Sequence, residues 1–300
     1  MRMLGALVVA ALSLGPAGTG LPAHKGWWQP RPLSSWAYVI GENYPLTIPP
    51  LVGGHRTKVQ VVDADLGDES GLEPSGRPKV DPTIVASVRR IHAMGAHAIC
   101  YLDAGSAESW RSDYRKFDPA EMGGPLSGWP DERFIDVADW SKPVPKRYET
   151  LRTIMSYRIG LCRREGFDAI EADNVNTYTN GDLGGFRLSM AEERTYVERL
   201  ILLAHHDHLA FFLKNEINGD GLLKELAPKV DGEIDEQCWQ YSECTALRIF
   251  VGERKPILNI EYEKIPRDKL CPRARAFPMA TIRAGLDLAG KITYGCWTSS

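Results

Sequence analysis

The sequence predicts an α/β fold, a single-domain (β/α)8 TIM barrel, for three reasons. Short apolar runs rich in β-forming residues alternate with longer segments of helical period, which indicates parallel strands joined by helical crossovers. Eight such runs occur within 300 residues, and a barrel of this type takes about 250. The first run is followed by Gly41-Glu42-Asn43 instead of a glycine-rich phosphate loop, which disfavours a doubly wound nucleotide-binding sheet.

The expected strands and helices follow from the spacing of apolar residues. The strands are predicted over residues 37–40, 58–63, 97–102, 134–137, 167–173, 209–214, 232–236 and 256–261. The helices are predicted over residues 82–94, 146–165, 189–206 and 219–226. Pro82 after Asp81 suits the first turn of a helix, and Gly95 and Gly166 suit helix ends.

The N-terminus has the pattern of a secretory signal. Arg2 precedes a mostly apolar run over residues 4–14, and small residues and helix breakers follow it. The run is shorter than the roughly 20 residues that a membrane-spanning helix needs. We therefore expect a signal peptide over residues 1–23, a linker over residues 24–35 and a catalytic barrel over residues 36–300. The mature protein is expected to be secreted and extracellular, with no membrane contact after signal removal.

Charge and cysteine content narrow the partners further. The net charge of −3 provides no overall field for nucleic acid, so no nucleic-acid partner is expected. Six cysteines suit an oxidising compartment. Cys238 with Cys244 is the first expected disulfide and Cys271 with Cys296 the second, while Cys100 is either a buried thiol or the partner of Cys162. The sequence contains no CxxC pair, which disfavours a structural zinc site, and neither a metal nor a cofactor is expected.

Polar residues gather where the predicted strands end, which is the functional face of such barrels. Alternation along the fifth strand sends Glu171 and Asp173 to the same side, and crowded carboxylates are costly unless a cation, proton or ligand compensates them. The other strand-end residues are Asp63, Asp65, Asp103, Asp136, Asn174, Lys214, Asn215, Asp235, Glu236, Glu261 and Tyr262.

Three kinds of chemistry suit this cluster of carboxylates. The candidate ligands of a hard metal ion are Asp63, Asp65, Glu171 and Asp173. A non-catalytic barrel would use the same face to bind carbohydrate or a cation. Glycoside hydrolysis needs two carboxyl groups flanking one bond, and sugar rings stack on aromatic side chains. Aromatic residues near this face are Tyr44, Tyr101, Trp110, Trp129, Tyr178, Trp239 and Tyr262.

Several separated motifs resemble glycoside hydrolase family 114, which comprises endo-α-1,4-polygalactosaminidases on a TIM-barrel fold. They are Cys100-Tyr101, Ala104-Gly105-Ser106, Glu108-Ser109-Trp110-Arg111, Gly166-Phe167-Asp168, Glu171-Ala172-Asp173-Asn174, Leu213-Lys214-Asn215, Glu236-Gln237-Cys238, Glu243-Cys244 and Glu261-Tyr262. The resemblance implies hydrolysis of α-1,4-linked galactosamine, as in galactosaminogalactan, without a cofactor. It places the catalytic pair at Asp173 and Glu236. The motif departs at Ala172, where the family is expected to have proline.

The expected partner is thus a cationic amino-sugar polysaccharide, bound by a monomer. Substrate-binding roles are predicted for Asp63, Asp65, Tyr101, Asp103, Glu171, Asn174, Lys214, Asn215, Glu261 and Tyr262. Lys214 is expected to keep a neighbouring carboxylate ionised. Glu236 is the preferred proton donor and Asp173 the preferred ionised partner.

Overall fold

A computed structural model describes residues 26–67, 71, 75–141, 146–179, 185–217 and 221–297. The predicted signal peptide and the first two residues of the predicted linker lie outside this part of the chain.

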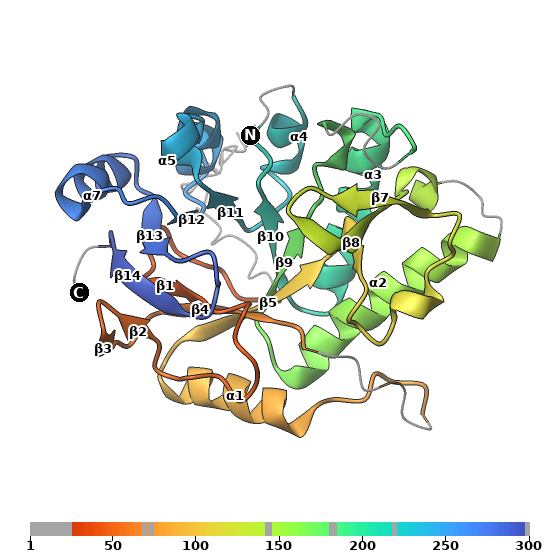
Figure 1. Cartoon of the computed structure of the whole chain (residues 1–300), viewed down its shortest axis with the longest axis horizontal. Coiled ribbons are helices and arrows are strands. Elements are labelled where there is room, and N and C mark those ends of the chain that lie inside the picture. Colours follow the sequence, from red (N-terminus) through yellow and green to blue (C-terminus); the bar gives the residue numbers. More distant parts are fainter. Residues whose placement is uncertain are drawn as a thin grey trace, which may run out of the picture.

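The described residues form a TIM barrel with eight parallel strands (Figure 1). In order around the barrel these are β1 (Trp36–Tyr38), β4 (Val61–Asp65), β5 (His97–Asp103), β9 (Ala169–Asp173), β10 (Ala210–Lys214), β11 (Gly232–Glu236), β12 (Ile257–Glu261) and β13 (Ala280–Ala284). Adjacent strands in this order pair in parallel register. The Trp36 indole donates to the carbonyl of Ala280 at 2.8 Å, which joins the first strand to the last.

Strand register decides which side chains point into the barrel. Tyr101 pairs with Glu171, and Lys214 with Ile234, so these four residues face the same side. The strands are buried along nearly their whole length because helices cover their outer face. The inward side chains at the C-terminal ends of the strands therefore build the floor of the barrel mouth.

Helices surround the strands. They are α1 (Pro82–Ala93), α2 (Lys146–Glu165), α3 (Met190–His206), α4 (Leu222–Leu226), α5 (Cys238–Tyr241), α6 (Arg248–Gly252) and α7 (Arg267–Ala276). Asp81 caps α1 by accepting from Thr83 N at 2.6 Å, with Pro82 in the first turn as predicted. Ser189 and Glu192 form a capping box at the start of α3.

The prediction of a barrel strand over residues 134–137 was wrong. Phe134 and Ile135 belong to β8 (Trp129–Ile135), which pairs antiparallel with β6 (Ser106–Glu108) and β7 (Met122–Leu126) in a separate three-stranded sheet (Figure 1). Much of β8 is exposed, as expected for a sheet with one solvated face. Asp136 therefore lies at no barrel strand end, and its carboxylate accepts from Ala138 N at 3.0 Å.

The eighth barrel strand is β13, which was not predicted. It follows α7, a strongly charged helix that contains Pro272 and also was not predicted. After β13 the sheet continues through β14 (Lys291–Gly295), β2 (Leu51–Val52) and β3 (His55–Arg56). The helix predicted over residues 219–226 corresponds to α4, which begins at Leu222, and residues 219 and 220 lie outside the described part.

All six cysteines are paired. The disulfides join Cys238 to Cys244 and Cys271 to Cys296, as predicted, and Cys100 to Cys162, which settles the open alternative for Cys100. The bridge between Cys100 and Cys162 ties β5 to α2.

The segment before β1 lies against the opposite end of the barrel from the strand ends. The rings of Trp27 and His205 stack at 3.9 Å, and those of Trp28 and His97 at 4.3 Å. Trp27 also donates to Asp231 at 3.1 Å. None of the helices within the described ranges is both long and apolar enough to cross a bilayer.

Candidate active site

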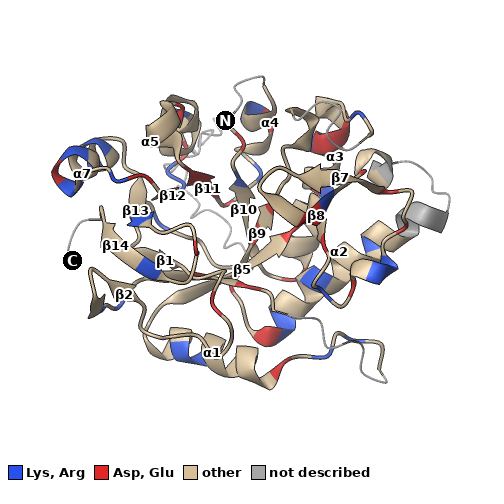
Figure 2. Ribbon diagram, in the orientation of Figure 1, with Lys and Arg blue, Asp and Glu red and all other residues tan. Residues whose placement is uncertain are grey.

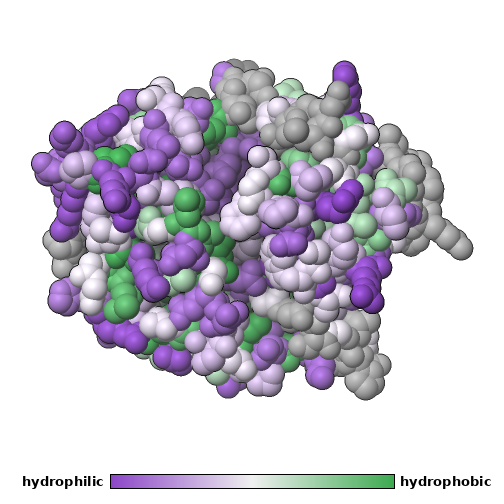
Figure 3. All heavy atoms as spheres, viewed as in Figure 1, coloured by the Kyte–Doolittle hydropathy of each residue, from purple (hydrophilic) through white to green (hydrophobic). Residues whose placement is uncertain are grey.

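A cavity of about 650 Å³ opens at the C-terminal ends of the barrel strands. Figure 2 shows acidic segments in β11 and beside β5 and β9, and Figure 3 shows hydrophilic residues around a recess in the middle of the molecule. Of the predicted site residues, six line this cavity: Asp65, Tyr101, Asp173, Asn174, Asn215 and Glu236. The cavity thus joins residues from five strands or strand ends.

Three successive strands turn sharply where they reach the cavity. Asn174, Asn215 and Gln237 directly follow β9, β10 and β11, and each has a left-handed backbone, with φ of 58°, 53° and 63°. Asparagine tolerates this conformation better than most residues. The chain therefore leaves the barrel immediately after Asp173, Lys214 and Glu236, and these side chains stay at the mouth.

Gly105 lies against one of these turns. A Cβ at Gly105 would be 1.6 Å from the carbonyl oxygen of Asn174, so only glycine fits without moving the backbone that follows Asp173.

The Lys214 ammonium is the centre of the site. Its Nζ atom lies 2.7 Å from Glu171 Oε1, 3.5 Å from Asp173 Oδ1 and 3.6 Å from Glu236 Oε1. Burial lowers the pKa of Lys214, but attraction to these three carboxylates outweighs burial and raises it well above its usual value. Lys214 is thus a fixed positive charge beneath two cavity-lining carboxylates.

Asp173 and Glu236 both approach this ammonium. The two distances to Lys214 limit the separation of Asp173 Oδ1 and Glu236 Oε1 to their sum, roughly 7.1 Å. This limit admits the whole range of retaining glycosidases, about 5–5.5 Å, and the lower part of the inverting range, about 6.5–9.5 Å.

The two carboxylates differ in the donors around them. Asp173 accepts from the Tyr101 hydroxyl at 2.9 Å and from Asn174 N at 2.9 Å. Glu236 accepts from the Tyr262 hydroxyl at 2.7 Å, and the Asn215 amide lies 3.5 Å from its other oxygen. Glu236 is also the more exposed, with 27% of its side chain accessible against 18% for Asp173.

A second layer of acids lies below the pair. Asp63 and Glu171 are completely buried, and the Tyr38 hydroxyl donates to Glu171 Oε1 at 3.0 Å. Burial, followed by repulsion from Glu171, raises the pKa of Asp63 well above its usual range. Burial also raises the pKa of Glu171, although Lys214 opposes the rise. Burial thus favours the neutral form of Asp63, while Glu171 binds Lys214.

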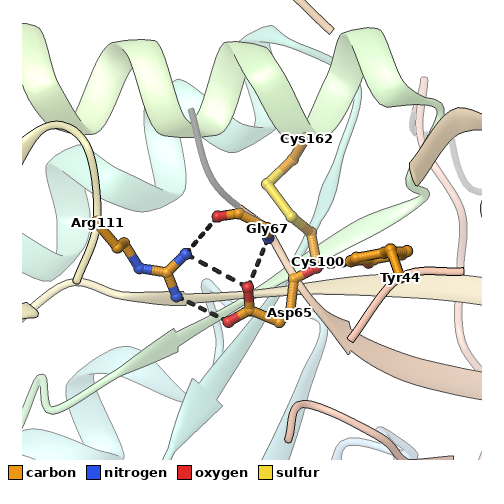
Figure 4. Close-up of a disulfide and its surroundings, with 6 residues drawn as sticks. All are labelled: Tyr44, Asp65, Gly67, Cys100, Arg111 and Cys162. Atoms are coloured by element: carbon orange, nitrogen blue, oxygen red, sulfur yellow. Dashed lines mark hydrogen bonds and ion pairs between the residues drawn. A yellow bond between two sulfur atoms is a disulfide. The ribbon is translucent and has the colours of Figure 1, made fainter. Parts of the chain in front are cut away.

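Asp65 belongs to an ion-pair network at the edge of the cavity. Arg111 donates to Asp65 Oδ2 at 2.7 Å, to the carbonyl of Gly67 at 2.6 Å and to Glu108 Oε1 at 2.9 Å. Figure 4 shows the contacts with Asp65 and Gly67 beside the disulfide between Cys100 and Cys162. Burial raises the pKa of Glu108 to about 7, against the opposing effect of Arg111. The network fixes the three-stranded sheet to the end of β4.

Asp103 is buried beside Asp173 and connects two walls of the site. Its Oδ2 accepts from the Asn174 amide at 2.7 Å and lies 2.6 Å from the Ser106 hydroxyl. The same hydroxyl lies 2.9 Å from Glu132 Oε2. A hydroxyl has one proton, so one of these two contacts needs a protonated carboxyl. Burial, together with repulsion from Asp173 and Glu132, raises the pKa of Asp103 to about 7.

Two predicted residues have other surroundings. Glu261 points out of the barrel and is completely buried, where its carboxylate accepts from Trp239 N at 2.9 Å and from Asn259 at 3.1 Å. Tyr262 points inward and contacts the cavity-lining Glu236. Of the aromatic residues predicted near this face, Tyr44, Tyr101, Trp110 and Trp129 line the cavity.

Tyr38 and Glu132 line the cavity and were not singled out in the sequence. Tyr38 ends β1, and its inward position follows from the strand alternation that also places Trp36 inside. Glu132 had no signal, because it lies before the strand predicted over residues 134–137, and its place at the cavity follows from the pairing of β8 with β6. Within the described ranges, no group of three or more His, Cys, Asp or Glu side chains is arranged to hold a metal ion.

Comparisons with known proteins show the family of the chain. Among solved structures, Ega3 of Aspergillus fumigatus, crystallised in complex with galactosamine, is 25% identical over 89% of this chain and 97% of that one, with a TM-score of 0.71. The glycoside hydrolase domain of PelA from Pseudomonas aeruginosa shares the fold, with 14% identity, coverage of 85% and 96%, and a TM-score of 0.58. No curated protein matches the sequence significantly. The model of glycoside-hydrolase family GH114 matches residues 18–298, so the chain belongs to this family and is a glycoside hydrolase.

Proposed function

We propose that the protein is a secreted endo-acting hydrolase of α-1,4-linked galactosamine polysaccharide, with Asp173 and Glu236 as its catalytic pair. The observation that carries the proposal is the position of Lys214, which approaches both carboxylates within 3.6 Å at the floor of the cavity. Two inward carboxyl groups that share one ammonium suit attack on one glycosidic bond from two sides.

Glu236 is the proposed proton donor to the leaving oxygen. Its position nearer to solvent gives it access to water and to the departing chain end. Asp173 is the proposed ionised partner, because the backbone amide of Asn174 donates to it at 2.9 Å, whereas the amide beside Glu236, that of Asn215, is 3.5 Å away. Asp173 then faces the developing positive charge at the anomeric carbon, either by bonding to that carbon or by activating a water molecule.

The charge of the cavity supports an amino-sugar substrate. Carboxyl groups of Glu42, Asp65, Asp81, Glu108, Glu132, Asp173, Glu236 and Asp287 line it, whereas Arg111 is the basic residue that its described lining contains. A polymer with free ammonium groups would be attracted to this face although the whole chain carries only −3. The similarity to Ega3, whose structure contains galactosamine, points to the same sugar.

The test is incubation of the secreted protein with fully deacetylated α-1,4-galactosamine oligomers, followed by mass spectrometry. Internal cleavage into shorter oligomers is expected. Intact oligomers after prolonged incubation, with cleavage of a neutral α-linked polysaccharide instead, would contradict the proposed substrate.

A further inference from the structure

The sheet of β6, β7 and β8 forms one wall of the cavity. Glu108 and Glu132 sit opposite each other on paired strands, and both line the cavity although only 2% and 6% of each residue is exposed. Trp110 and Trp129 line the same wall and are 56% and 51% exposed. The wall therefore has carboxyl groups at its base and indole rings at its rim.

The Glu108 and Glu132 carboxyl groups differ in the partners that contact them. Glu108 is paired with Arg111, which also binds Asp65. Glu132 instead contacts Ser106, which provides at most one proton to the Asp103 and Glu132 carboxyls together. Burial is the main cause of a raised pKa for Glu132. An ammonium group bound beside Glu132 would favour the ionised form of this carboxyl against the effect of burial.

The two indole rings are unusually exposed for tryptophan. Large aromatic side chains are normally mostly buried, and two half-exposed indoles on one cavity wall mark a binding surface. Their flat faces suit the apolar face of a sugar ring, and their edges leave ring substituents free to reach the carboxyl groups below. The wall thus matches the two features that a 2-amino sugar offers, an apolar ring face and an ammonium group.

We propose that this wall is a subsite for one amino-sugar unit next to the cleaved bond, in which Glu132 receives the ammonium group while Trp110 and Trp129 cover the ring. The subsite is adjacent to the catalytic pair because Ser106, Asp103 and Asn174 link Glu132 to the turn after Asp173. Such a subsite would favour a free amine over an acetamide, since the latter carries no charge. This inference rests on the proposed function and adds a specificity-determining residue to it.

The experiment compares KM and kcat of Glu132→Gln with the wild type on deacetylated and N-acetylated oligomers of equal length. The expected result is a KM for the deacetylated oligomer raised about tenfold, a nearly unchanged kcat and reduced preference for the free amine. Asp131→Asn is the matched control, because Asp131 is an exposed neighbour on the same strand and lies outside the cavity lining. This control should behave like the wild type.

Trp129→Ala tests the rim independently of folding, since half of this side chain is exposed. It should raise KM for both oligomers by a similar factor, whereas Tyr241→Ala, equally exposed but outside the cavity lining, should not. If the wild type cleaves the deacetylated oligomer and Glu132→Gln keeps its KM and its preference, the subsite is refuted while the proposed function stands. If the wild type cleaves no galactosamine oligomer, the proposed function itself fails.

Discussion

Lys214 Nζ lies 2.7 Å from Glu171 Oε1, and both side chains are buried beneath the mouth of the barrel. The ion pair fixes the ammonium at the point where it also faces Asp173 and Glu236. It also makes the site dependent on one cation, because burial makes an uncompensated carboxylate expensive.

Replacement of that cation should therefore damage both stability and catalysis. Lys214→Met leaves Glu171, Asp173 and Glu236 without their shared positive charge, and removal of one partner of a buried pair costs about 3–5 kcal/mol. We expect a lower midpoint in urea unfolding and a kcat reduced by orders of magnitude. The control is Lys229→Met, which removes an exposed pair with Glu198 and should change both quantities little. Equal effects of the two variants would contradict the central role of Lys214.

Gly105 should be sensitive to a single added carbon. Gly105→Ala places a Cβ against the Asn174 carbonyl and must displace the turn after Asp173, at a cost of about 1–3 kcal/mol. Both kcat and the urea midpoint are expected to fall. Gly252→Ala, where the added Cβ meets no atom within 4 Å, serves as the comparison and should be neutral. A fully active Gly105→Ala variant would show that the turn moves without disturbing the carboxylate.

The stability of the protein should decrease as the pH rises from about 4.5 to 7. Burial raises the pKa of Glu193 from 4.5 to about 7, so the folded chain binds a proton there that the unfolded chain has already lost. The stabilising contribution is complete below pH 4.5 and is lost as the pH passes 7. One shift of this size corresponds to about 3 kcal/mol.

Glu193→Gln measures this effect, because Glu193 lies in α3 away from the cavity lining. Urea unfolding of this variant between about pH 5 and 8 should show a smaller loss of stability than the wild type. Glu192→Gln removes an adjacent charge from the surface capping box. In this variant the free energy of unfolding should change with pH as it does in the wild type. If the free energy of unfolding of Glu193→Gln changed with pH as in the wild type, Glu193 would be ionised over the whole measured range.

Much of the fold and site was predictable because periodicity determines both. Functional residues follow the C-terminal ends of barrel strands, and this rule selected Asp65, Asp173 and Glu236 from the sequence; all three line the cavity. Alternation also placed Glu171 and Asp173 on one side, where both approach Lys214.

The elements that were not predicted depend on how strands distant in the sequence pair with one another. Phe134 and Ile135 form a buried run like that of a barrel strand, and only their antiparallel partners reveal a separate sheet. β13 contains two alanines and Arg283 among its five residues, so its local pattern was weak. The same errors hid Glu132, whose position at the cavity follows from the pairing of β8 with β6.

The catalytic pair is tested most directly by the turnover of Asp173→Asn and Glu236→Gln on a deacetylated α-1,4-galactosamine oligomer. Each change keeps the size of the side chain and removes one carboxyl group from the proposed pair. We expect kcat to fall by at least roughly a thousandfold in both variants, while urea unfolding and oligomer binding stay close to the wild type. Near-normal turnover in either variant, in folded protein that binds the oligomer, would contradict the assignment of Asp173 and Glu236 as the catalytic pair.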